Sequence, residues 1–189
     1  MTSTEIYHQS IDKQRIIVIG GGSGLIASLI VHALRLHNRR FDYVNGGKTE
    51  SLKKDSPIII NANEVQPIEY KHHIVVFGNN ASEADLALFE KLANATPKSG
   101  TIIYPKANSS LSKICAQERM DVQAIPYEVY NHEVANGKTL LITSTSERFP
   151  IQLHGNLDLQ GVSAAKEVLK KIGISSGQFY KAISQYKPA

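Results

Sequence analysis

Apolar residues follow two alternating patterns along the first part of the chain. In one pattern, short runs are apolar at almost every position, which is typical of strands buried on both faces of a parallel sheet. In the other, apolar residues recur at the spacing of an amphipathic helix, as in residues 25–37 and 82–95. The clearest apolar runs are 15–19, 57–62, 74–78 and 100–105. This alternation predicts an α/β fold with a mainly parallel sheet flanked by helices.

The other segments extend this prediction. Ser82 and Asp85 have the spacing of a capping box, so a helix is expected to begin there. Residues 41–47 indicate a strand that ends in a glycine turn, and residues 48–56 indicate a polar connection. Residues 123–155 contain short β-rich runs joined by turns, which is typical of a small antiparallel β portion. Further helices are expected near 110–118, at 162–172 and at 177–186.

Length and composition favour one domain. The 189 residues are enough for one core and too few for two full-sized domains, so we expect a short N-terminal tail (1–12) followed by a single domain (13–189). No apolar run reaches the roughly 18 residues that span a bilayer, and the tail lacks the apolar segment of a secretion signal. Cys115 is the single cysteine, which excludes an internal disulfide and favours a buried structural thiol. We therefore expect a cytoplasmic protein without membrane contact.

The charge pattern gives little support for a nucleic-acid partner. The net charge is +4, from 21 basic and 17 acidic residues spread over the chain. Its small basic clusters, such as Lys166 with Lys170 and Lys171, lack interleaved aromatic residues and favour solvated helix faces. Of the seven histidines, His72 and His73 are adjacent and would point to opposite faces of a strand, so no metal site is predicted.

A glycine-rich turn follows the first predicted strand and precedes the first long helix. It consists of Gly20, Gly21, Gly22, Ser23 and Gly24. Glycines let the backbone approach an anion closely, and the first N–H groups of the following helix would point at it. The turn therefore predicts a phosphate- or nucleotide-binding position.

Three interpretations of this turn remain open on its residues alone. The spacing of Gly22, Gly24 and Ala27 fits a loose dinucleotide fingerprint, with Asp42 as the candidate ribose ligand, although Asp42 begins its strand instead of ending it. The turn also fits a P-loop that lacks its lysine, because Leu25 follows Gly24. The third interpretation is a structural turn that packs the helix tightly on the sheet and binds nothing.

Several segments, in order, resemble the central ATP-binding domain of the Mur ligases. The resemblance covers roughly residues 13–187 and is greatest to the UDP-N-acetylmuramate:L-alanine ligase and muropeptide ligase branches. The matching segments are 21–27 for the G-T-x-G-K-T-[ST] loop, 43–47 for the V-N-G-G turn, 61–64 for E-A-D-E, 77–83 for T-N-I-x-x-D-H, 86–103 for a helix and strand, and 155–165 with 172–174 and 182–186 for the G-x-H-N-x-x-N-A-x-A-A segment and the final helix. This resemblance implies a P-loop-like fold.

At the ligand-binding positions of the family, the chain departs from the pattern. The loop lysine is replaced by Leu25, and the D-H and H-N pairs are replaced by Ser82–Glu83 and Leu157–Asp158. In the acidic segment Asn61 and Asn63 replace the first and third residues, and Glu64 keeps its charge. Mur ligases form an acyl phosphate from a carboxylate and Mg-ATP, and that chemistry depends on the lysine, hydroxyls and carboxylates which are replaced here. The remnant active-site positions therefore predict no catalytic residue and no metal ligand.

The resemblance implies a stand-alone, catalytically inactive relative of the central domain, without the family's two flanking domains. We expect a binding or interaction protein linked to peptidoglycan metabolism, with a protein partner or self-association, weak binding of ATP and Mg²⁺ at most, and a nucleotide or UDP-sugar as the candidate ligand. Two alternatives stay open: an active ATP-dependent ligase or ATPase subunit that needs partner chains, and an NAD-binding Rossmann-type protein.

Overall fold

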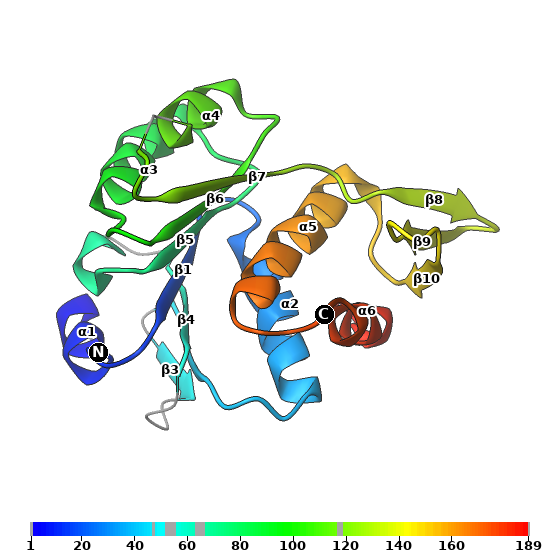
Figure 1. Ribbon diagram of the computed structural model, residues 1–189, viewed down its shortest axis with the longest axis horizontal. Helices are drawn as coiled ribbons and strands as arrows, with labels where there is room; N and C mark the ends of the chain where they lie inside the picture. The colour runs from blue at the N-terminus through cyan, green and yellow to red at the C-terminus, as the bar shows by residue number, and fades with distance from the viewer. Residues whose placement is uncertain (1, 47, 52–55, 63–66, 117–118, 189) are drawn as a thin grey trace.

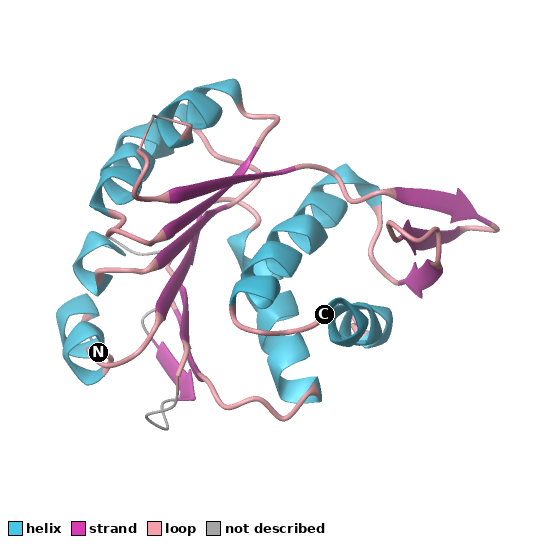
Figure 2. Ribbon diagram, in the orientation of Figure 1, coloured by secondary structure: helices cyan, strands magenta, loops and turns pink. Residues whose placement is uncertain are grey.

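The computed structural model describes residues 2–46, 48–51, 56–62, 67–116 and 119–188, and its main element is a seven-stranded sheet (Figures 1 and 2). The strands lie in the order β3-β2-β4-β1-β5-β6-β7. Their bounds are β1 Arg15–Ile19, β2 Asp42–Asn45, β3 Lys48–Ser51, β4 Ile58–Asn61, β5 Ile74–Phe77, β6 Thr101–Pro105 and β7 Gln123–Tyr127. All neighbouring strands pair in parallel except β3, which pairs antiparallel with β2 at the edge.

Two helical layers cover the sheet (Figure 1). One layer contains α2 (Ser23–Leu36) and α5 (Gly155–Lys171), with α6 (Ser176–Gln185) packed against these two helices and β10; the other contains α1 (Ser3–Gln9), the 3-10 helix η1 (Pro67–Tyr70), α3 (Glu83–Ala95) and α4 (Ser109–Cys115). Successive side chains of a strand point to opposite faces, so Ile16 and Val18 join the first core while Ile17 and Ile19 join the second. The described helices include none that is both long and apolar enough to span a bilayer.

A separate three-stranded antiparallel sheet lies beside α5 and α6 (Figure 1). Its strands are β8 (His132–Ala135), β9 (Lys138–Ile142) and β10 (Arg148–Ile151). This sheet confirms the expected antiparallel portion, but the expected start at residue 123 is wrong. Residues 123–127 form β7, which pairs in parallel with β6. As an edge strand β7 is mostly exposed and carries Pro126, so its pattern differs from that of the buried parallel strands.

Three further boundaries differ from the expectations. Residues 48–51 form β3, although residues 48–56 were expected to be a polar connection, because an edge strand needs no apolar run. Helix α5 begins at Gly155 instead of near residue 162, since its first turn is polar and solvent-exposed. The expected tail contains α1, which begins with a capping box formed by Thr2 and Glu5 and buries Ile6 completely.

The parallel register places the glycine turn and the segments that follow β4 and β5 at the same edge of the sheet. Val18 pairs with Asn61 on β4, and Ile19 pairs with Phe77 on β5. The segments that follow these strands therefore meet at the carboxyl edge, where ligands bind in open α/β sheets.

Candidate functional site

The glycine turn is a short connection between β1 and α2. Only residues 20–22 lie between the two elements, since β1 ends at Ile19 and α2 begins at Ser23. Gly20 has φ +96° and Gly22 has φ +84°, which are left-handed conformations that glycine adopts without strain. Gly22 is the N-cap of α2 and provides no capping side chain. The first turn of the helix therefore depends on backbone contacts.

The turn packs directly against the segment that follows β5. The Gly78 N–H donates to Ile19 O at 2.7 Å, and the Asn80 N–H donates to Gly21 O at 3.2 Å. A Cβ atom on Gly78 would lie 2.0 Å from Gly21 O, and one on Gly21 would lie 2.2 Å from Asn80 O. Backbone atoms occupy the space that these Cβ atoms would need. Gly21 and Gly78 are therefore required for packing, whether or not a ligand binds.

The Asn79 side chain lies between the glycine turn and α5. Its Nδ2 donates to Leu157 O at 2.6 Å, and a Cβ on Gly22 would lie 2.3 Å from its Oδ1. One side chain thus connects the glycine turn, the end of β5 and the first turn of α5. No role was predicted for Asn79, although the resemblance aligns residues 77–83 with a ligand-binding segment.

The N-terminus of α2 retains anion-binding geometry. The N–H groups of Gly24 and Leu25 have no hydrogen-bond partner among the described residues. They lie beside a depression of about 440 Å³ lined by the turn, Ala62, Asp85, Leu88 and Phe89. Free N–H groups at a helix N-terminus favour a phosphate or carboxylate. Among the described lining residues none is Lys, Arg or His, so no cationic side chain adds to them.

Leu25 is part of the packing between α2 and α5. A Cβ on Gly161 would lie 3.3 Å from Leu25 Cδ2, so the side chain rests on α5 where that helix has no side chain of its own. Ile26 and Ala27, which the resemblance to the G-T-x-G-K-T-[ST] loop aligns with its hydroxyl residues, are 0% exposed. Ser28 bonds the Tyr186 hydroxyl at 2.9 Å. The expected lysine and hydroxyl positions are therefore filled by packing residues.

Asn61 lies buried at the end of β4, beside the turn in register. Its Nδ2 donates to Asn45 Oδ1 at 2.8 Å, and its own Oδ1 has no partner among the described residues. An amide replaces the charge that a carboxylate would bring to this position. Asn63 and Glu64 lie outside the described residues.

The other remnant positions lie at the starts of two helices, where Ser82 and Asp158 take part in capping. Ser82 is the N-cap of α3 and forms the expected capping box with Asp85, and Glu83 is exposed in the first turn of that helix. Asp158 accepts the His154 N–H at 3.3 Å at the start of α5, while Leu157 is 58% exposed. Of the positions expected from the sequence, the glycine turn and the Leu157 backbone lie close together, and Asn79 contacts both.

The described residues do not fit the nucleotide and magnesium site of a P-loop. The described residues contain no cluster of three or more His, Cys, Asp or Glu side chains able to hold a metal ion. Cys115 is buried, and burial raises the pKa of its thiol to about 12, which keeps it protonated and unreactive. Among the described residues, the free N–H groups of Gly24 and Leu25 remain at the start of α2, and the depression beside the turn is lined by no Lys, Arg or His side chain.

Asp42 does not support the dinucleotide interpretation. It is the first residue of β2, is completely buried and pairs with Lys13. Through Ile58 it is in register with Arg15, the first residue of β1. The glycine turn follows the other end of β1, roughly 15 Å away along the strand direction. Asp42 therefore cannot hold the ribose of a dinucleotide bound at the turn.

Comparisons with known proteins agree on the fold. No family model matches the chain, and no characterised protein matches its sequence. Among solved structures, it is similar to the UDP-N-acetylmuramate:L-alanyl-gamma-D-glutamyl-meso-diaminopimelate ligase of Neisseria meningitides, with a TM-score of 0.74 and 14% identity over 99% of this chain and 69% of that one. The murein peptide ligase of Psychrobacter arcticus gives a TM-score of 0.77 and 14% identity, over 97% of this chain and 49% of that one.

The fold likeness extends beyond the Mur ligases. Folylpolyglutamate synthetase from Lactobacillus casei gives a TM-score of 0.68 and 8% identity, over 97% of this chain and 67% of that one. At such identities the likeness shows a Mur-ligase-type α/β fold and does not distinguish the branches. This chain spans about half of the length of the Psychrobacter protein.

Proposed function

We propose that this chain is a non-catalytic binding or interaction protein built on the Mur-ligase-type fold. The observation that carries the proposal is the filling of the loop-lysine position by Leu25, which packs on α5 beside Gly161. The glycine turn serves as a packing element, and among the described residues the groups that could hold a phosphate there are the free N–H groups at the start of α2. Such a contact binds weakly and activates nothing.

The chemistry of the fold relatives supports this proposal. Phosphoryl transfer needs cations and metal ligands that neutralise the charge developing on the phosphoryl group. In this chain the depression at the turn has no cationic lining among the described residues, and Asn61 is uncharged. Removal of a group that neutralises this charge lowers the rate of phosphoryl transfer by orders of magnitude.

We further propose a cytoplasmic role linked to peptidoglycan metabolism, in the manner of the UDP-N-acetylmuramate:L-alanine ligase and muropeptide ligase branches, exerted through a protein partner or self-association. The similarity of the fold to that of a muramate tripeptide ligase and a murein peptide ligase supports this proposal. A nucleotide or UDP-sugar is the candidate ligand of the carboxyl edge.

One observation favours a second function. The chain spans 49% of the length of the Psychrobacter murein peptide ligase. An ATP-dependent ligase or ATPase subunit that is completed by partner chains would fit that relation. This alternative requires ATP turnover at the glycine turn.

ADP formation from Mg-ATP separates the two functions. We expect the wild-type protein to form no ADP above the rate of a Glu64→Gln variant, because the lysine and hydroxyl positions are filled by Leu25, Ile26 and Ala27. The assay is run with the purified chain and with a lysate of its native cell, which supplies partner chains. ADP formation that depends on the added protein and is lost in Glu64→Gln would establish the ligase or ATPase alternative.

A further inference from the structure

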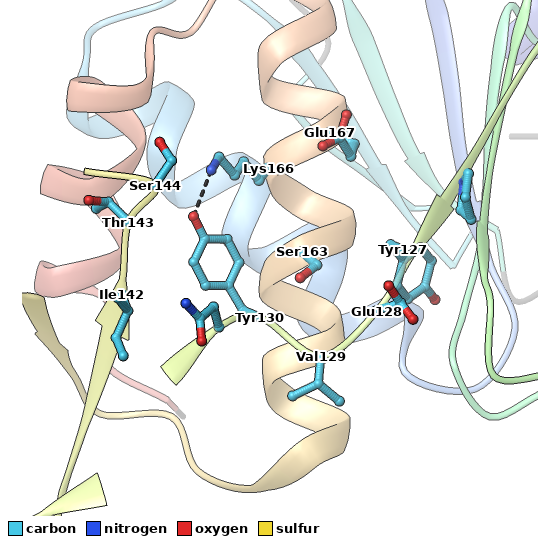
Figure 3. Close-up of a pocket in the computed structure, with 12 residues that line it drawn as sticks. Tyr127, Glu128, Val129, Tyr130, Ile142, Thr143, Ser144, Ser163, Lys166 and Glu167 are labelled. Atoms are coloured by element: carbon cyan, nitrogen blue, oxygen red, sulfur yellow. Dashed lines mark hydrogen bonds between the residues drawn. The ribbon is translucent and has the colours of Figure 1, made fainter. Parts of the chain in front are cut away.

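A second hollow lies away from the glycine turn, between α5 and the three-stranded sheet (Figure 3). It has a volume of about 390 Å³ and is lined by the chain that connects β7 to β8, by the end of β9, and by Ser163, Lys166 and Glu167 of α5. We call it the α5 groove. None of the site positions expected from the sequence lies in it.

Lys166 is a half-buried cation in this groove. Its Nζ donates to the Tyr130 hydroxyl at 2.6 Å and to the Tyr180 hydroxyl at 3.1 Å, as Figure 3 shows for Tyr130. The ammonium also lies 4.9 and 5.1 Å from the centres of these two rings. Among the described residues no carboxylate lies within 4 Å of it. Hydrogen bonds to the two tyrosines thus hold the cation, and it forms no ion pair with any residue that the structure describes.

The polar groups of Lys166, Tyr130 and Tyr180 have more hydrogen atoms to donate than they use among themselves. The Tyr130 and Tyr180 hydroxyls bond each other at 2.6 Å, which uses one of their two hydrogens. The Lys166 ammonium has three hydrogens and directs two of them to the tyrosines. Burial raises the pKa of Tyr130, so that this hydroxyl stays protonated. One hydroxyl hydrogen and one ammonium hydrogen therefore have no acceptor among the described residues.

The same groove contains a carboxylate without a cation. Glu167 follows Lys166 on α5, and Figure 3 shows the two side chains leaving the helix on different sides. Among the described residues no Lys, Arg or His lies within 4 Å of Glu167, whereas Glu128 on the rim pairs with Lys106 at 3.2 Å. The α5 groove therefore offers one positive and one negative position.

The wall of the groove also has free backbone groups. Residues 128–131 connect β7 to β8 and belong to neither sheet. Within the described residues, the N–H groups of Glu128 and Val129 have no hydrogen-bond partner. A ligand with its own amide groups can pair with such a segment, as a peptide does when it adds to a strand edge.

We propose that the α5 groove binds a free amino acid or a short peptide in its zwitterionic form. The ligand carboxylate accepts hydrogen bonds from the Lys166 ammonium and the tyrosine cluster, and its ammonium group faces Glu167. A phosphate dianion is disfavoured, because Glu167 and Glu128 line the same hollow. The proposal concerns a different part of the molecule from the glycine turn and does not rest on the proposed function.

Titration followed by amide NMR tests the proposal with four probes: glycylglycine, N-acetylglycine, glycinamide and inorganic phosphate. We expect glycylglycine to shift the amide signals of residues 128–131 and 163–167. N-acetylglycine lacks the ammonium group and glycinamide lacks the carboxylate, so each should bind at least about five-fold more weakly. No shift with glycylglycine, or equal or tighter binding of phosphate at these residues, would overturn the proposal.

Variants on α5 distinguish recognition from a structural role. Lys166→Met should abolish binding of glycylglycine, while Lys170→Met, which removes an exposed lysine of the same helix, should leave it unchanged. Because Lys166→Met also removes a link between α5 and the tyrosines, Glu167→Gln provides the second test. It should remove the preference for glycylglycine over N-acetylglycine without changing thermal unfolding. An unchanged preference would contradict the assignment.

Discussion

Gly78→Ala should destabilise the protein by about 3 kcal/mol, near the upper end of the overpacking range. The new Cβ would lie 2.0 Å from Gly21 O and 2.9 Å from Gly21 C. These are backbone atoms of a turn fixed between β1 and α2, so no side-chain rotation relieves the contact. The turn would have to move away from β5 and break the hydrogen bond from Gly78 N–H to Ile19 O. Urea denaturation followed by circular dichroism measures the change.

Gly24→Ala is the matched control. Gly24 lies in the first turn of α2, has no atom within 4 Å of the position of a Cβ, and belongs to a helix in which alanine is preferred. This variant should be as stable as the wild type or more stable by up to about 1 kcal/mol. If Gly78→Ala were as stable as Gly24→Ala, the turn would not be closed against β5 as described.

His72 should cause the protein to lose about 3 kcal/mol of stability as the pH falls from 7 to 4. Burial, followed by the nearby His73, lowers the pKa of His72 from 6.5 to about 4. The Thr96 hydroxyl donates to Leu92 O and so accepts from His72 Nε2 at 2.9 Å, which leaves a buried Nδ1 without a partner in the described residues. A proton added at Nδ1 would have no acceptor.

The sign follows from proton binding in the two states. Between pH 6.5 and about 4 the unfolded chain binds a proton at this residue and the folded chain does not, so acid favours unfolding. The stabilising contribution is complete above pH 6.5 and is lost as the pH falls through the folded pKa. Urea denaturation at several pH values should show a shallower pH dependence for His72→Gln than for the wild type. His8→Gln, at an exposed position of α1, should keep the wild-type slope. Equal slopes for all three proteins would show that His72 does not cause the loss of stability in acid.

The central part of the sheet could be predicted from the sequence because its strands are buried on both faces. β1, β4, β5 and β6 are wholly buried and nearly all apolar, so local composition determines them. β3 and β7 lie at the sheet edges, where the pattern depends on which face meets solvent. Local sequence therefore did not predict β3, and for β7 it predicted a strand but not its parallel pairing with β6.

The candidate site was predictable in its position and not in its contacts. Glycines between a buried strand and a helix indicate an anion position from local sequence alone. The closure of that turn depends on Asn79 and Leu157, which β5 and α5 bring to it from distant parts of the chain. Packing of Leu25 on α5 likewise depends on Gly161. Such contacts follow from the tertiary arrangement and leave no local pattern.

The α5 groove was missed for the same reason. Tyr130, Lys166 and Tyr180 belong to three separate elements, and Lys166 was expected to lie on a solvated helix face. The sequence contained one usable signal, the many tyrosines for a chain without tryptophan, 8 in all. The contact of Tyr130 and Tyr180 with Lys166 depends on the packing of α5 and α6, which local sequence does not reveal.

We propose that the glycine turn does not support magnesium-dependent nucleotide chemistry. Calorimetric titration of ATP into the wild-type protein, with and without Mg²⁺, tests it most directly. With Leu25 in place of the loop lysine, we expect binding to be weak and the affinity to be the same with and without the metal. The Leu25→Lys variant should bind ATP several-fold more tightly than the wild type, because the added ammonium joins the free N–H groups at the start of α2. Tight wild-type binding that requires Mg²⁺ would contradict the claim.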